Sequence, residues 1–270
     1  MKLNLFDSSF SHAESSVAGR KPKYIIWNRD EPDILCQSMY TNEKTLTKSN
    51  NPDMSLGWLL ESKEYIPHIY AEVRRYLDGF KYIFTSDSYL LETYPDKCKF
   101  SPSGGIWVSG DKSPGEIKIY DKTKKCSLVV GLKMMCKMHQ IRVSVAELLH
   151  TKIDVMGDLV GKYVPIIDSL KDYMFTIVIE NHRSKNYFTE KILNAFSCGV
   201  VPIYLGCYDI GKFFDINGII QVSSIDEIMY VIHKLNENQY YDRIKAVQNN
   251  FELCKKYEVI EDFIYENYLK

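Results

Sequence analysis

Five polar residues that can bind or transform a ligand gather in one short stretch of the sequence. They are Glu180, Asn181, Tyr187, Glu190 and Lys191. Carboxylate, amide, phenol and ammonium groups can hold the hydroxyls and phosphates of a ligand, and a carboxylate can also accept a proton. Because apolar segments enclose these residues on both sides, the stretch predicts a binding or catalytic site.

The elements that would position this site are a strand, a helix and a second strand. Residues 175–179 (FTIVI) are apolar and rich in β-branched side chains, which favours a buried parallel strand. Thr189 is a suitable N-cap for a helix over 190–198, and residues 200–205 form the next strand. In such a right-handed βαβ unit, ligands bind beyond the carboxyl ends of the strands. The five polar residues are therefore expected on one rim.

Similar alternation extends along the rest of the chain. Before the site we expect a loose lead-in over 1–22, strands at 24–27 and 80–85, an irregular segment at 41–53, helices at 64–77 and 87–94, and a turn leading to a short strand over 100–110. Around the site we expect strands at 126–132, 153–155 and 218–222, and helices at 141–149 and 225–235. A linker over 110–125 would separate two Rossmann-like α/β halves, 1–115 and 116–270, the second with a helical tail.

Composition narrows the function classes. The 270 residues carry a net charge of −1, which gives no basic excess for nucleic acid. No run of about 18 apolar residues predicts a membrane span, and the first residues lack the apolar core of a signal peptide. Seven scattered cysteines without a Cys-x-x-Cys pair favour a reducing compartment, so we expect a cytoplasmic protein of a bacterium or of a virus-infected cell.

The sequence also lacks the usual metal-binding patterns. It has no Asp-x-Asp pair, and its six histidines form neither His-x-His nor His-Glu-x-x-His. We expect no metal and no cofactor.

The stretch 179–206 (IENHRSKNYFTEKILNAFSCGVVPIYLG) resembles the signature of the α1,3-fucosyltransferases, glycosyltransferase family ten. The matching features are the Glu-Asn pair, the Tyr-x-Thr-Glu-Lys block and the later Gly-x-Val-Pro. Segments 55–67, 80–108 and 122–142 also resemble that family, so the similarity runs from about residue 55 to residue 228. It is closest to short bacterial or viral members. Lys63 and the Gly131-Leu132 pair depart from the pattern.

The resemblance implies a GT-B enzyme that moves fucose from GDP-fucose to a glycan hydroxyl with inversion. It implies that Glu61, in the acceptor-side half 1–115, is the general base. In the donor-side half 116–270 it implies that Arg142 meets the diphosphate. Lys191, in the first turn of the helix over 190–198, would add a charge for the same phosphates, and Glu190, on the donor side, would accept from a ribose hydroxyl. Glu180, Asn181 and Tyr187 would complete the donor site.

Several alternatives stay open at this stage. The donor could be another GDP-sugar or a UDP-sugar, or the protein could bind a nucleotide or glycan without turnover. Glu31 rivals Glu61 as the base, and His139 could face the diphosphate. Glu61 could instead cap a helix starting at residue 64, and each cation could be an ordinary surface charge.

Overall fold

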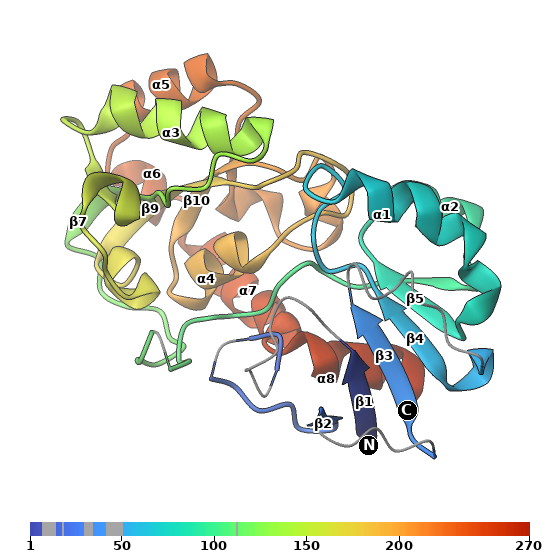
Figure 1. Ribbon diagram of the computed structural model, residues 1–270. Helices are drawn as coiled ribbons and strands as arrows, with labels where there is room; N and C mark the ends of the chain where they lie inside the picture. The colour runs from blue at the N-terminus through green and yellow to red at the C-terminus, as the bar shows by residue number, and fades with distance from the viewer. Residues whose placement is uncertain (7–14, 18, 30–34, 42–50, 112) are drawn as a thin grey trace.

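The protein is described by a computed structural model that covers residues 1–6, 15–17, 19–29, 35–41, 51–111 and 113–270. These residues form two parallel β-sheets with helices on both faces, which confirms the predicted α/β class (Figure 1).

The first sheet has the strand order β2-β1-β3-β4-β5-β6, and all its strands are parallel. Its elements are β1 (Lys2–Phe6), β2 (Ile26–Asn28), β3 (Gln37–Thr41), β4 (Ser55–Trp58), α1 (Pro67–Glu72), β5 (Tyr82–Thr85), α2 (Ser88–Thr93) and β6 (Cys98–Phe100).

The second sheet has the strand order β11-β10-β9-β7-β8 and is also parallel throughout. Its elements are β7 (Lys124–Val129), α3 (Lys137–Leu149), β8 (Asp154–Met156), β9 (Tyr173–Ile179), α4 (Glu190–Ser197), β10 (Val201–Leu205), β11 (Ile220–Gln221) and α5 (Ile225–Lys234). The tail consists of α6 (Asn238–Tyr241), α7 (Ile244–Cys254) and α8 (Ile260–Ile264).

The central βαβ unit is confirmed. β9 and β10 pair in parallel from Phe175–Val201 to Ile179–Leu205, and α4 connects them. Side chains of β9 alternate between two cores, so Ile177 packs with α3 and α5 while Val178 packs with α4. Both faces of this strand are thus buried, which explains its uninterrupted apolar sequence.

The first sheet is built differently from the prediction. The lead-in expected over 1–22 is wrong, because β1 lies inside the sheet between β2 and β3. Leu3 and Leu5 alternate into the core, and Asn4 accepts a hydrogen bond from Asn28 at 2.7 Å. The predicted strand at 24–27 corresponds to β2. Of the segment 41–53, residues 42–50 lie outside the described residues.

The segment after β6 also differs from the prediction. Residues 101–110 contain no strand, and β6 ends just before them, at Phe100. The segment is held by contacts with distant elements instead: Ile106 N donates to Glu258 O at 3.0 Å, and Trp107 N donates to Asn194 Oδ1 at 2.7 Å. Trp107 thus bonds to a side chain of α4 instead of to a neighbouring strand, so residues 101–110 form no β-ladder.

The C-terminal helix returns to the first sheet. Ile260 and Ile264 of α8 share a core with Leu3, Leu56 and other residues of that sheet. Figure 1 shows this red segment beside the blue strand β1, with both chain ends on the same unit. No helix among the described residues is both long and apolar enough to cross a membrane.

Candidate active site

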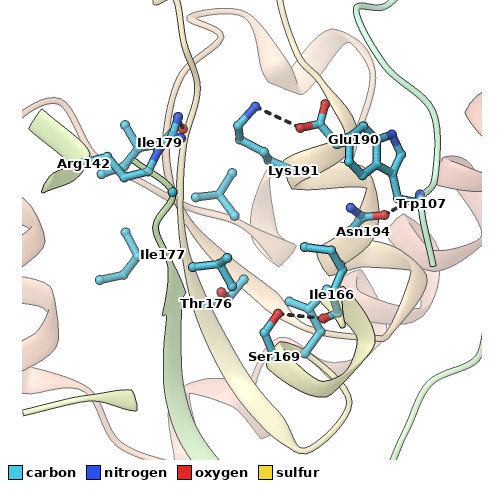
Figure 2. A pocket seen from close by; sticks show the side chains of 14 residues that line it. Trp107, Arg142, Ile166, Ser169, Thr176, Ile177, Ile179, Glu190, Lys191 and Asn194 are labelled. Carbon is cyan, nitrogen blue, oxygen red and sulfur yellow. Dashed lines mark hydrogen bonds and ion pairs between the residues drawn. The ribbon is translucent and has the colours of Figure 1, made fainter. Parts of the chain in front are cut away.

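A cavity of about 180 Å³ opens at the carboxyl ends of β7 and β9 (Figure 2). Apolar residues of β9 form its floor, while Arg142, Glu190, Lys191 and Asn194 bring polar groups to its wall. A second cavity of about 250 Å³ shares Trp107 and three other lining residues with it. Together they form an elongated site of the kind that parallel sheets offer to ligands.

Glu180 is hydrogen-bonded to Thr189, the N-cap residue at the start of α4. It has no exposed surface, and it accepts hydrogen bonds from Thr189 N at 3.0 Å and from Thr189 Oγ1 at 2.7 Å. Tyr204 also donates to it, at 3.4 Å. Burial raises the pKa of this carboxyl. The structure therefore buries Glu180 beside Thr189, where it fixes the N-cap residue of α4.

Lys191 lies between two carboxylates. Its Nζ is 3.1 Å from Glu190 Oε1 and 3.7 Å from Glu180 Oε2. Burial acts to raise the pKa of Glu190, but the Lys191 charge and hydrogen bond outweigh it, so this pKa is lowered. These carboxylates offset the cost of a cation at a helix start. Lys191 still lines the cavity, where it can meet an anionic ligand (Figure 2).

Arg142, His139 and Asn181 form one hydrogen-bonded group. Arg142 Nη2 donates to Ile179 O at 2.7 Å and to Asn181 Oδ1 at 2.9 Å, and His139 Nε2 lies 3.1 Å from the same Asn181 oxygen. Because that oxygen already accepts from Arg142, the His139 nitrogen donates as well. Burial first, and then the charge of Arg142, lower the pKa of His139, which favours a neutral ring. The fork of Arg142 is thereby held at the cavity wall.

Glu61 reaches the same region from the first unit. It lies between β4 and α1, and its backbone carbonyl accepts a hydrogen bond from Tyr70 at 2.7 Å. Burial raises the pKa of the Glu61 carboxyl and so does the charge of Glu190, while Lys133 and Lys191 lower it. The two halves therefore bring Glu61 and the Glu190-Lys191 pair within electrostatic reach of one another.

Glu61 is not needed as a helix cap. Ser62 serves the following turn: its carbonyl accepts from Tyr65 N and Ile66 N at 3.0 Å, and its hydroxyl accepts from Tyr65 N at 3.2 Å. α1 itself starts only at Pro67.

The remaining predicted residues are placed as follows. Tyr187 is 3% exposed and packs edge-on against His182, with ring centroids 5.7 Å apart, so it supports the loop between β9 and α4. Burial raises the pKa of its hydroxyl. Glu31 lies outside the described residues. Among the described residues, no group of three or more His, Cys, Asp or Glu side chains could hold a metal ion.

Trp107, Asn194 and Gly104 are site residues that sequence reasoning missed. Asn194 is buried in α4, and its Oδ1 accepts from Trp107 N at 2.7 Å and from Val108 N at 3.3 Å. A Cβ atom on Gly104 would lie 2.7 Å from Glu190 N. The available signals were a polar residue on an otherwise apolar helix and the Gly104-Gly105 pair before an aromatic residue.

The structure has two parallel-sheet units, and acidic and basic side chains come together beside a cavity at the strand ends. This arrangement is that of the GT-B class of architecture. The chain belongs to glycosyltransferase family 10 (fucosyltransferase), because the C-terminal model of that family matches residues 121–267, just over half of the chain.

Individual relatives agree with this assignment. The chain is 32% identical over 127 residues to alpha-(1,3)-fucosyltransferase 4 of Mus musculus, a match that covers 44% of the chain and 29% of the relative. It is 24% identical over 260 residues to a putative fucosyltransferase of Acanthamoeba polyphaga mimivirus, which covers 85% of the chain and 39% of the relative. The chain thus spans less than half the length of these curated relatives.

Solved structures support the fold. A crystal structure of an alpha1,3-fucosyltransferase superposes with a TM-score of 0.57 at 15% identity, covering 99% of this chain and 90% of that one. A crystal structure of an alpha1,3-fucosyltransferase with GDP-fucose gives 0.53 at 13% identity, covering 96% and 90%. The predicted GT-B fold is confirmed.

Proposed function

We propose that this protein transfers fucose from GDP-fucose to a hydroxyl of a glycan acceptor, with inversion at the anomeric carbon. The observation that carries the proposal is that Glu190 and Lys191 of the second unit line one cavity, while Glu61 of the first unit lies within electrostatic reach of both. Family membership and the GDP-fucose held by a structural relative support this donor.

The proposed reaction is a single displacement. The acceptor oxygen attacks the anomeric carbon, Glu61 takes the proton of that hydroxyl, and the bond to the diphosphate breaks with its electron pair leaving on GDP. Arg142 and Lys191 stabilise the charge that develops on the phosphate oxygens, without a metal ion. Glu190 binds a ribose hydroxyl. Glu180, Asn181 and Tyr187 keep these groups in place.

The proposal assigns one role to each half. Residues 1–115 supply the acceptor side and the base. Residues 116–270 supply the donor side and the helical tail, of which α8 packs on the first sheet. The free, buried thiols of Cys126, Cys198 and Cys207 support work in a reducing compartment such as the cytoplasm.

Thermal unfolding with GDP, UDP, CMP, GDP-fucose and GDP-mannose, each with and without EDTA, tests the donor. Ligand at about 100 times its dissociation constant stabilises a protein by roughly 2.7 kcal/mol. We expect GDP compounds to stabilise the protein, GDP-fucose most of all, with no effect of EDTA. A response to UDP alone, or one abolished by EDTA, would overturn the donor assignment.

Product formation from labelled GDP-fucose on a panel of glycans then tests transfer. We expect the parent protein to give a fucosylated product and Glu61→Gln to bind GDP as the parent does without turnover. If the parent binds GDP-fucose but transfers to no acceptor and does not hydrolyse it, the protein is a binding module.

A further inference from the structure

We propose that Glu64 is a positioning residue: its carboxylate joins the two halves of the protein and so holds the turn that carries Glu61 over the donor site. This inference rests on the proposed function for the role of Glu61, whereas the contact between the halves is independent of it.

The carboxylate of Glu64 uses each of its oxygens for a different element of the second half. Oε1 accepts a hydrogen bond from the backbone N of Lys137, the first residue of α3, at 3.1 Å. Oε2 lies 3.2 Å from His182 Nδ1, in the loop that follows β9. Glu64 itself belongs to the turn before α1, in the first half. One side chain thus touches two elements of the opposite unit.

The start of α3 needs an external partner. Its N-cap residue, Cys136, makes no side-chain capping bond, and its thiol donates instead to Asn181 O at 3.3 Å. The first N–H groups of a helix have no partner within the helix, and the helix dipole favours an anion there. Glu64 supplies that anion from the first half, so the cap of this 13-residue helix comes from the other half of the protein.

The second contact reaches the loop between β9 and α4, which contains His182. His182 directly follows Asn181, which holds Arg142, and its ring packs against Tyr187. The Glu64-His182 contact therefore ties the first half to the loop whose Asn181 holds Arg142 at the cavity wall.

The turn that joins Glu61 to Glu64 is short and internally bonded. Ser62 O accepts from Tyr65 N and Ile66 N at 3.0 Å, and Tyr70 holds the carbonyl of Glu61 at 2.7 Å. A displacement of Glu64 is thus passed to Glu61. An error of about 1 Å in the place of a reacting group can cost 100-fold in rate.

A surface ion pair without further role is the competing explanation. The side chains of His182 and Glu64 are 25% and 31% exposed, so their pairing alone would contribute little to stability. The two explanations differ in what they predict: a surface pair affects neither rate nor geometry, while a positioning residue affects the rate more than ligand binding or unfolding.

Steady-state kinetics of Glu64→Ala test the inference in the full chain. We expect kcat to fall about tenfold or more, the KM for GDP-fucose and the affinity for GDP to change less than about threefold, and the unfolding temperature to stay near that of the parent. Glu64→Gln keeps an acceptor for Lys137 N and an amide for the imidazole, so it restores most of kcat. We expect His182→Ala to lower kcat by less than Glu64→Ala does. In the Glu64→Ala background, His182→Ala lowers kcat by less than it does in the parent, because the contact is already lost.

Asp78→Ala, which removes an exposed acid of the same half, is the matched control and leaves kcat unchanged. The inference is overturned if Glu64→Ala keeps the parent kcat, or if kcat, GDP affinity and unfolding temperature fall together and Glu64→Gln restores none of them.

A distance measurement separates this inference from the proposed function. Spin labels on Glu92→Cys in α2 and Tyr230→Cys in α5, both exposed, report the separation of the halves in a Cys36→Ser background. We expect one narrow distance distribution in the labelled protein that keeps Glu64 and a broader one in its Glu64→Ala variant. This expectation holds even if the parent fails to transfer fucose. An identical distribution in both would overturn the inference, and a parent without transferase activity would overturn only the proposed function.

Discussion

Arg142 of α3 and Asn181 at the end of β9 are joined by a hydrogen bond of 2.9 Å, in which the guanidinium donates to the amide oxygen. His139 donates to that same oxygen. With two donors on its oxygen, Asn181 must turn its NH₂ group away from both of them, so the orientation of the amide is determined by its neighbours. Arg142, a cation at the cavity wall, thus depends for its position on the neutral side chain of Asn181.

Replacing Arg142 by Lys is expected to weaken GDP binding about tenfold or more, although the charge is kept. A lysine cannot bond Ile179 O, Asn181 and a phosphate in one plane. Titration calorimetry with GDP measures the effect, and Arg75→Lys, at an exposed site in the first half, is the control. Equal affinity in Arg142→Lys and the parent would show that the guanidinium is not a phosphate ligand.

Glu61→Gln is expected to lower kcat/KM by about 100- to 10,000-fold. In the proposed mechanism the carboxylate of Glu61 is the active form, and burial raises its pKa. Activity should therefore rise with pH through a value above the usual range of glutamate and be lost as pH falls below it. The pH profile of kcat/KM checks this, and the residual activity of Glu61→Gln should lack that limb. The same acidic limb in the variant would point to another base, such as Glu31.

Gly104→Ala is expected to reduce donor affinity, because the new methyl group would lie 2.7 Å from Glu190 N and 2.9 Å from Glu190 Oε2. The start of α4 must then shift away from residue 104. Gly131→Ala is a control at the wall of the same cavity, since a Cβ there meets nothing within 4 Å. Equal GDP affinities for the two variants would contradict this packing argument.

Asn194→Leu is expected to destabilise the protein by about 1–3 kcal/mol, because it leaves the N–H groups of Trp107 and Val108 without their acceptor. Urea unfolding measures the loss, and Gln248→Leu on the exposed face of α7 provides a comparison. GDP affinity should fall as well, since Trp107 lines the cavity. Unchanged stability would mean that both groups find other partners.

The second sheet was predictable because its information is local. The run 175–179, the cap Thr189 and the strand 200–205 follow one another within a single crossover, and Thr189 does accept a bond from Lys191 N at 3.3 Å. Buried parallel strands also have a strong apolar pattern. The same locality made the polar rim predictable as a group.

The first sheet was less predictable because its strands gain stability from distant segments. β1 has only Leu3 and Leu5 as apolar alternation, and it forms because β2, β3 and α8 pack around it. Glu180 shows a comparable difficulty within the site: its position after an apolar strand marked it as important, but its complete burial depends on Thr189 and Tyr204 folding over it.

The return of α8 to the first sheet has a consequence for the order in which the protein can mature. Ile260 and Ile264 complete the core that begins with Leu3, more than two hundred and fifty residues earlier. During synthesis, the ribosome releases the second sheet while the first still lacks part of its core. The core of the first sheet is therefore complete only after α8 has been made, although the strands of that sheet are made much earlier.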